Sequence, residues 1–389
     1  MTSPAVHGGA DAGWGAVADA FARNFAEHGD VGAACAVYVD GAPVVDLWGG
    51  LADRDTVRAW DRDTLGITFS TTKGITAIVC NRLIEQGRLD PDAPVAVYWP
   101  EFAANGKERV TVGDVLSHRA GLAHCEGAFT LDEVMAVTPV VQALAAQAPI
   151  WEPGTAHGYH ARTYGWLTGE IVRRVTSTSL GAWFAAELAA PLGLDFHIGL
   201  PEALESRVAR LYPPLADAEL AALVDAAMSD PATLMGRVMS GPSGLFRYDD
   251  MWNTRALHAT EMPSSNGIGD ARSLARCYAA CVGEVVTPAG GFRALADATV
   301  DRATTLRSEG TDLVLGMPTA FGLGFTGPAM LPPGVGPRAF GHAGAGGSLG
   351  FADRDARIGF GYVMNQMQLG MTGDARTAGL VRAVYDAFG

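Results

Sequence analysis

The chain has 389 residues, of which 48% are hydrophobic and 18% are charged, a composition typical of a globular protein with a large core. Its formal net charge of −14 makes the phosphate backbone of nucleic acids and anionic membrane surfaces poor partners, so we expect neither. No stretch approaches the roughly 20 apolar residues that a membrane span needs.

The N-terminal part of the chain predicts one helix, two strands and a polar loop. In chain order these segments are residues 16–27, 32–39, 43–48 and 49–63. Asp40-Gly41 suits the hairpin turn between the two strands. An apolar run then ends at Phe69, and a helical pattern begins directly after it.

The middle of the chain is mainly helical. Helices are expected over residues 112–116, 130–146, 164–175, 179–190, 219–228 and 270–282. Thr111 and Asp270 are suitable N-caps for the first and last of these helices. Residues 210–246 have weak periodicity and predict a long surface loop with one or two short helices.

The last hundred or so residues return to strand patterns and end in a helix. The strands are expected at residues 320–325, 339–342, 347–353 and 358–365, and the helix at residues 372–388. The sequence therefore predicts an α+β fold, in which residues 1–68 and 285–389 form a discontinuous domain with one antiparallel sheet flanked by helices. Residues 69–284 would form a mainly helical domain, with the active site in the cleft between the two.

Ser70 and Lys73 lie one helical turn apart at the start of the first helix after Phe69. A serine hydroxyl needs a base to act as a nucleophile, and an amine kept away from water can lose its proton and serve as that base. Lys73 and Lys107 are the only lysines, and an arginine could not do this because it does not deprotonate. An ordinary N-cap serine beside a solvated lysine is the alternative, and the residues alone leave both open.

Two further segments are candidates to meet Ser70. Tyr159 precedes a helix, where a tyrosine is commonly part of the core but is also suited to lie near a lysine, whose positive charge would favour phenolate. Residues 340–350 are rich in glycine, which lets backbone N–H groups approach a ligand, although a tight hairpin is equally glycine-rich.

Three segments in this order resemble the class C β-lactamase and penicillin-binding-protein group of serine hydrolases, and most of all the family VIII carboxylesterases. They are Ser70-Thr71-Thr72-Lys73, then Tyr159 preceded by Trp151-x-Pro153-Gly154, then His342-Ala343-Gly344 in the place of Lys-Thr-Gly. Residues 116–122, 263–267 and 321–325 are also similar to segments of these proteins. The resemblance spans the chain from Val31 to the C-terminus.

The resemblance implies a mechanism of acyl transfer. Ser70 would attack the acyl carbonyl, Lys73 and Tyr159 would serve as general base and acid, and the backbone N–H groups of Ser70 and Ala345 would form the oxyanion hole. No metal and no cofactor are implied.

Substrate contacts are expected from His342, Gly344 and Trp252, although core packing explains Trp252 equally well. His157 and His160, like His118 and His124, lie close in sequence, but no further ligand completes a zinc pattern.

Two departures from the lactamase pattern bear on the substrate. The run Tyr159-His160-Ala161 lacks the Asn of Tyr-x-Asn, and His342 replaces a lysine, so that a fixed positive charge becomes a partial one near neutral pH. Both changes favour uncharged esters over β-lactams. We therefore predict a carboxylesterase-type serine hydrolase acting on small-molecule esters. The alternatives are an acyltransferase of the same chemistry, a β-lactamase or D-aminopeptidase, and a catalytically silent binding protein.

The first 13 residues lack the basic and apolar regions of a secretory signal. The five cysteines are scattered and contain no C-x-x-C pair, which favours reduced thiols and a cytoplasmic location. The sequence predicts no oligomeric state.

Overall fold

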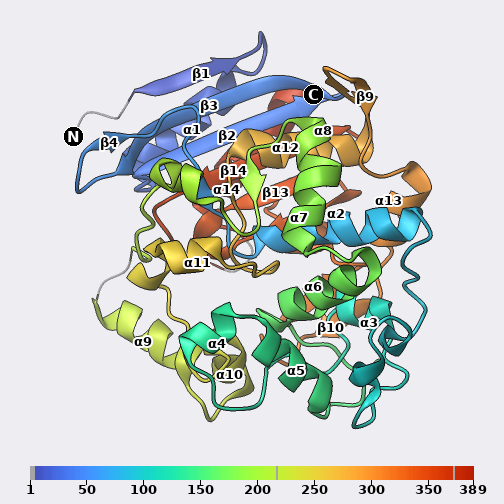
Figure 1. Ribbon diagram of the computed structural model, residues 1–389. Coiled ribbons are helices and arrows are strands. Elements are labelled where there is room, and N and C mark those ends of the chain that lie inside the picture. Colours follow the sequence, from blue (N-terminus) through green and yellow to red (C-terminus); the bar gives the residue numbers. More distant parts are fainter. Residues whose placement is uncertain (1–4, 216–217, 371–372) are drawn as a thin grey trace.

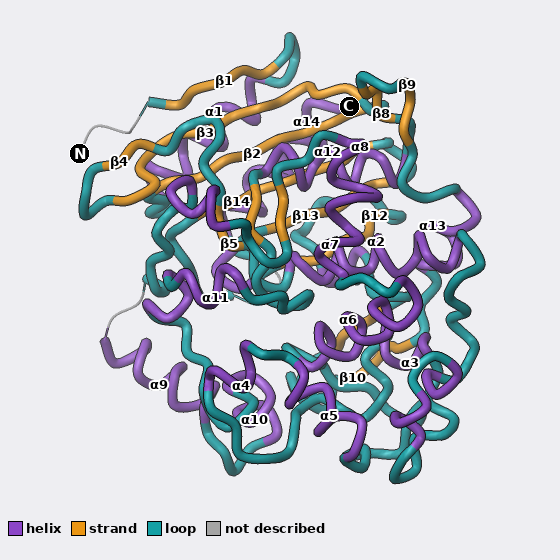
Figure 2. The backbone as a smooth tube through the Cα atoms, in the orientation of Figure 1, coloured by secondary structure: helices purple, strands orange, loops and turns teal. Residues whose placement is uncertain are grey.

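A computed structural model describes residues 5–215, 218–370 and 373–389. Figure 1 shows the N-terminal and C-terminal strands together at one end of the molecule and most of the green and yellow helices of the middle of the chain at the other. The tube in Figure 2 shows the same division into a strand-rich end and a mainly helical end. Within the described ranges, no helix combines the length and the apolar character that crossing a bilayer requires.

The main sheet has seven strands and is antiparallel at every pairing. Its order is β1-β3-β2-β14-β13-β12, with β4 beside β3. The strands are β1 Val6–Ala10, β2 Gly32–Val39, β3 Ala42–Asp53, β4 Arg58–Ala59, β12 Ala339–Ala343, β13 Leu349–Asp353 and β14 Ile358–Met364. Because β2 pairs with β14 in the centre, the two ends of the chain build one sheet, as the sequence predicts.

Both faces of this sheet are covered. On β2, Cys35 and Val37 face a core with helices α1 (Gly15–Glu27) and α14 (Ala375–Phe388), while Ala34 and Ala36 face the other core. On that second face lies α12 (Ala271–Val282), which packs on β14, β2 and β13.

Glycines on β14 permit a close approach of α12. A Cβ at Gly359 would lie 2.3 Å from the carbonyl oxygen of Ala275, and one at Gly361 would lie 2.1 Å from that of Ala271. The helix begins where predicted, since Asp270 accepts a hydrogen bond from the Ser273 N–H at 2.6 Å.

Helix α2 (Thr71–Glu85) connects the sheet to the helical part of the molecule. It is buried along nearly its whole length and contacts β12, β13, α6 and α13. The other α-helices are α3 Val112–Leu116, α4 Leu131–Met135, α5 Thr138–Ala146, α6 Thr163–Thr176, α7 Leu180–Phe184, α8 Ala190–Leu192, α9 Ala218–Ser229, α10 Leu234–Ser240, α11 Arg255–Ala259 and α13 Asp297–Thr304.

Short strands and short helical segments complete the fold. The strands are β5 Gly66–Ile67, β6 Phe196–His197, β7 Ile268–Gly269, β8 Val285–Thr287, β9 Gly290–Phe292, β10 Ser308–Thr311 and β11 Pro318–Phe321. The short helical segments are η1 Val95–Val97, η2 Pro100–Ala103, η3 Ala185–Ala189, η4 Glu202–Arg207, η5 Asp250–Asn253, η6 Pro328–Met330 and η7 Ala345–Gly347, of which η3 is a π-helix and the others are 3-10 helices.

Several predicted boundaries are wrong for local reasons. The single helix expected over residues 130–146 is two helices, because Val137 has a left-handed φ of 64° that interrupts it. The loop expected over residues 49–63 contains the end of β3 and all of β4. The residues from 210 to 246 include α9 and α10, as predicted, with residues 216–217 outside the described ranges. The predicted start of the last helix at residue 372 also lies outside them.

The predicted division of the chain after residues 68 and 284 stays a prediction. Helix α12 belongs by sequence to residues 69–284, and it packs on the sheet that residues 1–68 and 285–389 build.

Arg376 ties α14 to the sheet domain through a buried ion network. Its side chain is fully buried, with Nη1 lying 2.7 Å from Asp30 and Nη2 2.6 Å from Asp374. It also donates to the carbonyl oxygen of Gly346 in η7. Burial raises the pKa of Asp30, and the charge of Arg376 opposes this rise. The negative charge of Asp30 therefore depends on its ion pair with Arg376.

Replacing Arg376 by leucine should therefore leave the Asp30 charge buried and unpaired. We expect Arg376→Leu to lower the free energy of unfolding by about 3–5 kcal/mol in urea denaturation at neutral pH. Arg382→Leu on the exposed face of the same helix is the control and should change it by less than about 0.5 kcal/mol. Equal losses in the two variants would contradict the role given to this network.

Candidate active site

Ser70 lies at the N-cap position of α2, directly after a strained residue. Phe69 has a left-handed φ of 42°, which is unfavourable for a side chain of its size and is found chiefly where function requires it. Trp252 and Tyr248 hold the Phe69 ring by edge-to-face packing at centroid distances of 4.9 and 5.4 Å. The Ser70 hydroxyl makes no capping hydrogen bond, so the interpretation of Ser70 as an ordinary N-cap is wrong.

The amine of Lys73 is buried against Ser70. Its Nζ lies 3.1 Å from Ser70 Oγ and donates to the carbonyl oxygens of Ala161 at 2.7 Å and Ser264 at 2.9 Å. Burial, and then the charge of Arg162, hold the pKa of Lys73 well below its ordinary value of 10.5. A neutral amine has two N–H groups and one lone pair. With both N–H groups given to carbonyls, the lone pair is left for the Ser70 hydroxyl.

Tyr159 completes the group around Ser70. Its hydroxyl donates to Ser70 Oγ at 2.8 Å, and its ring centroid lies 4.8 Å from Lys73 Nζ. Burial raises the pKa of Tyr159 above its ordinary value, so the phenol keeps its proton. The expectation that Lys73 would favour a phenolate is wrong, because burial disfavours both charges.

Asp312, a residue that the sequence did not single out, accepts hydrogen bonds from the backbone at and near Tyr159. Asp312 is fully buried, and its Oδ1 accepts from the N–H groups of Tyr159 at 3.0 Å, Val314 at 2.8 Å and Leu315 at 2.9 Å. Its Oδ2 accepts from the Thr319 hydroxyl at 3.1 Å. The carboxylate thereby fixes the segment that carries Tyr159.

The acceptors of the Lys73 amine were also missed. They are backbone carbonyls, and a backbone carbonyl has no residue-type signature, although Ser264 lies in one of the segments that resemble the family. Arg162 was missed as well, and it is buried with its guanidinium 4.3 Å from the centre of the Phe246 ring.

His342 lies on β12 beside these groups, with its ring centroid 6.2 Å from that of Tyr159. Its Nδ1 donates to the carbonyl oxygen of Ala343 at 2.7 Å, which leaves the lone pair on Nε2. Within the described part of the chain, the buried Nε2 has no hydrogen-bond partner. Burial is the main cause that lowers the pKa of His342 to about 3. The expected partial positive charge is therefore wrong, and the ring is neutral.

The segment after His342 is joined to the segment that carries Ser70. Ser348 Oγ donates to the carbonyl oxygen of Thr68 at 2.7 Å, and a Cβ at Gly344 would lie 2.2 Å from each of these two oxygens. Glycine is therefore required at position 344. The N–H groups of Ser70 and Ala345 donate to no other residue among those described.

Trp252, which the sequence also placed among the substrate contacts, has a different environment from His342 and Gly344. Its side chain is 1% exposed, packs behind Phe69 and donates its indole N–H to the carbonyl oxygen of Arg247 at 2.7 Å. The structure thus gives Trp252 a packing role, and its contact with a substrate stays a prediction.

Comparison with known proteins identifies the family. A family model described as Beta-lactamase matches residues 18–384. The chain belongs to the beta-lactamase family. This assignment confirms the expected β-lactamase/transpeptidase-like fold.

Within the beta-lactamase family, several of the most similar proteins are esterases. The esterase/beta-lactamase LipL of Mycobacterium tuberculosis is 38% identical over 98% of this chain and 88% of its own length. The crystal structure of a family VIII carboxylesterase is 38% identical, has a TM-score of 0.85 and covers 98% of this chain and 100% of that one. EstA from Arthrobacter nitroguajacolicus Rue61a is 34% identical, with a TM-score of 0.86 and 97% coverage of both chains. The resemblance to family VIII is confirmed, and this beta-lactamase-family chain is a serine hydrolase.

The depressed pKa of Lys73 predicts how the stability of the folded protein changes with pH. The unfolded chain binds the lysine proton up to about pH 10.5, whereas the folded chain releases it at a much lower pH. Between the two pKa values the unfolded state binds more protons, so this lysine makes the free energy of unfolding rise with pH.

In this pH window the free energy of unfolding should therefore rise more steeply with pH for wild type than for Lys73→Met, by up to about 1.4 kcal/mol per pH unit. The measurement is urea unfolding of both proteins from neutral pH to about pH 9. Ser70→Ala keeps the lysine and should keep the wild-type slope. Parallel curves for wild type and Lys73→Met would mean that Lys73 is charged in the folded protein.

Proposed function

We propose that this protein hydrolyses uncharged carboxylic esters through a covalent acyl-Ser70 intermediate. The observation that carries the proposal is the set of contacts of the buried Lys73 amine. Two carbonyl oxygens take its N–H groups, and Ser70 Oγ lies 3.1 Å from the same nitrogen. A neutral amine in this position is a general base for the serine hydroxyl.

Acylation begins with transfer of the Ser70 proton to Lys73 Nζ as the Oγ–carbon bond forms. The carbonyl oxygen becomes an oxyanion and accepts from the backbone N–H groups of Ser70 and Ala345. Collapse of this intermediate breaks the bond to the leaving alkoxide, which takes the phenolic proton of Tyr159. The proton held by Lys73 then restores the phenol, so that acyl-Ser70 and a free alcohol remain.

Deacylation uses the same groups in reverse. Water gives a proton to the Tyr159 oxygen as the phenolic proton of Tyr159 passes to the neutral Lys73 amine, the water oxygen attacks the acyl carbon, and the oxyanion returns to the two N–H groups. Collapse then breaks the bond to Ser70 Oγ, which regains its proton as the acid leaves. No metal or cofactor is required for these steps.

The neutral ring of His342 supports an uncharged substrate. In lactamases of this group the equivalent position is a lysine, which offers a fixed charge to a substrate carboxylate. Here Nε2 offers only a lone pair, so it can accept a hydrogen bond but cannot pair with an anion. The names of the similar proteins, which include esterases and carboxylesterases, support an ester as the substrate.

Two alternatives use the same chemistry. An acyltransferase would pass the acyl group of Ser70 to an alcohol or amine instead of water. A β-lactamase or D-aminopeptidase would open an amide, and the name of LipL covers both esterase and β-lactamase. We rank both alternatives below ester hydrolysis. The β-lactamase ranks lower because position 342 carries no cation. A small-molecule ester is the proposed partner, with neither nucleic acid nor membrane.

The test compares wild type with Ser70→Ala and Lys73→Arg on p-nitrophenyl butyrate and on a chromogenic cephalosporin. We expect rapid ester cleavage by the wild type and little cephalosporin turnover. Ser70→Ala should lower kcat by roughly 10⁴-fold or more, and Lys73→Arg should lower it strongly because a guanidinium cannot accept the proton.

A fluorophosphonate probe provides the control, because it should label wild type and leave Ser70→Ala unlabelled. Ester cleavage that survives in Ser70→Ala would place the nucleophile elsewhere. A labelled wild type that turns over ester only when an alcohol is added would favour the acyltransferase.

A further inference from the structure

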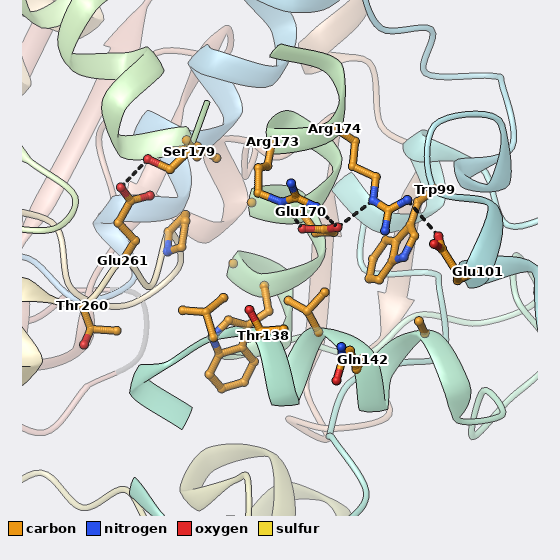
Figure 3. A pocket seen from close by; sticks show the side chains of 18 of the residues that line it. Trp99, Glu101, Thr138, Gln142, Glu170, Arg173, Arg174, Ser179, Thr260 and Glu261 are labelled. Carbon is orange, nitrogen blue, oxygen red and sulfur yellow. Dashed lines mark hydrogen bonds and ion pairs between the residues drawn. The ribbon is translucent and has the colours of Figure 1, made fainter. Parts of the chain in front are cut away.

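A cavity of about 820 Å³ lies in the helical part of the molecule, and none of Ser70, Lys73 or Tyr159 lines it. Helices α5 and α6 form two of its walls, with the start of α7 and residues 259–263 at one end (Figure 3). Its volume lies in the range of small-molecule sites. Much of the lining is apolar, including Val141 and Leu180. The cavity is therefore suited to the apolar body of a ligand.

One end of the cavity carries a carboxylate without a cation. Glu261 Oε1 accepts from the Ser179 hydroxyl at 2.6 Å, and Oε2 accepts from the Gly181 N–H at 3.0 Å, as Figure 3 shows for Ser179. Throughout the described residues, no arginine, lysine or histidine forms an ion pair with Glu261. Its negative charge is thus compensated only by two hydrogen-bond donors.

At the other end the charges cancel. Arg173 and Arg174 both bind Glu170, with Nε–oxygen distances of 2.7 and 2.6 Å, and Arg174 also binds Glu101 at 2.8 Å. Figure 3 shows this chain of alternating charges away from Glu261. Two carboxylates and two guanidinium groups sum to zero, which leaves the lining with a formal charge of −1 from Glu261.

The wall between the two ends contributes a further unused group. Trp166 is 2% exposed and lines the cavity, and its indole N–H has no partner within the described ranges. Its ring offers an aromatic surface, which attracts cations. An anionic ligand would meet the negative charge of Glu261, and a purely apolar one would leave this carboxylate without a cation.

We propose that this cavity is a binding site for a small cationic amphiphile, a primary amine with an apolar body. The ammonium group would donate to Glu261, and the apolar part would lie between α5 and α6. The site is distinct from the catalytic centre, although Pro263 in its lining is followed by Ser264, whose carbonyl accepts from Lys73. The proposal does not depend on the reaction that Ser70 performs.

The test measures binding of octylammonium chloride by isothermal titration calorimetry, with 1-octanol and sodium octanoate as ligands of matched length. Ser70→Ala protein is used, so that catalysis cannot contribute and the result is independent of the proposed function. We expect one site for octylammonium, with weaker binding of octanol and of octanoate. Glu261→Gln should weaken octylammonium binding roughly tenfold or more and leave octanol unchanged.

Two further variants control this result. Glu219→Gln removes a charge from the exposed helix α9 and should bind octylammonium as the parent does, which separates the site from general attraction to an acidic protein. Gly169→Leu should abolish binding of both octylammonium and octanol. A Cβ at Gly169 meets only Pro263, at 3.5 Å, so the larger side chain can enter the cavity while the fold is kept.

Thermal unfolding and circular dichroism confirm that each variant is folded. Should Glu261→Gln not fold, Gly169→Leu and the comparison of the three ligands decide the matter. Octylammonium bound equally by Glu261→Gln, equal affinity for octanoate, or no binding by the folded parent protein would each overturn the proposal.

Discussion

The burial of one lysine amine is the constraint on which the site depends. Moving a charged ammonium out of water is costly, so a lysine in this position gives up its proton unless a carboxylate compensates it. Among the residues that the structure describes, Lys73 has no such carboxylate, since its partners are the carbonyl oxygens of Ala161 and Ser264 and the hydroxyl of Ser70. Carbonyls stabilise N–H groups without adding a charge. The fold thereby places a neutral amine beside a serine, and burial keeps the neighbouring phenol of Tyr159 protonated, the two states that the proposed base and acid require.

Distant parts of the chain are needed to create this environment. The α2 helix presents Ser70 and Lys73, the segment before α6 presents Tyr159 and Ala161, and the segment before β7 presents Ser264. The sheet adds β12 and η7, which are fixed to residues 68–71 through Ser348. Because β2 and β14 pair in this sheet, both ends of the chain belong to the framework that holds these segments. The neutral His342 follows from the same burial.

The sequence predicted the parts of this arrangement that depend on residue type and spacing. Ser70 and Lys73 are one turn apart, Tyr159 follows a recognisable segment, and the strands at both ends have alternating or continuous apolar patterns. The rest depends on tertiary contacts. The carbonyls that bind Lys73 belong to no special residue type, Asp312 is close to Tyr159 only in space, and the neutral state of His342 results from burial. In the same way, the left-handed Val137 and the edge strand β1, which is short, glycine-rich and mostly exposed, have no periodic signal.

The pKa of Lys73 is the most direct test of this account. With only two lysines in the chain, protein labelled with ¹³C at lysine Cε gives two NMR signals, and Lys73→Met identifies the one that belongs to Lys107. The account predicts that the Lys73 signal titrates well below 10.5, so that the amine is available as a base when the enzyme works. A Lys73 signal that titrates near 10.5 in the folded protein would show a charged ammonium beside Ser70 and contradict the account.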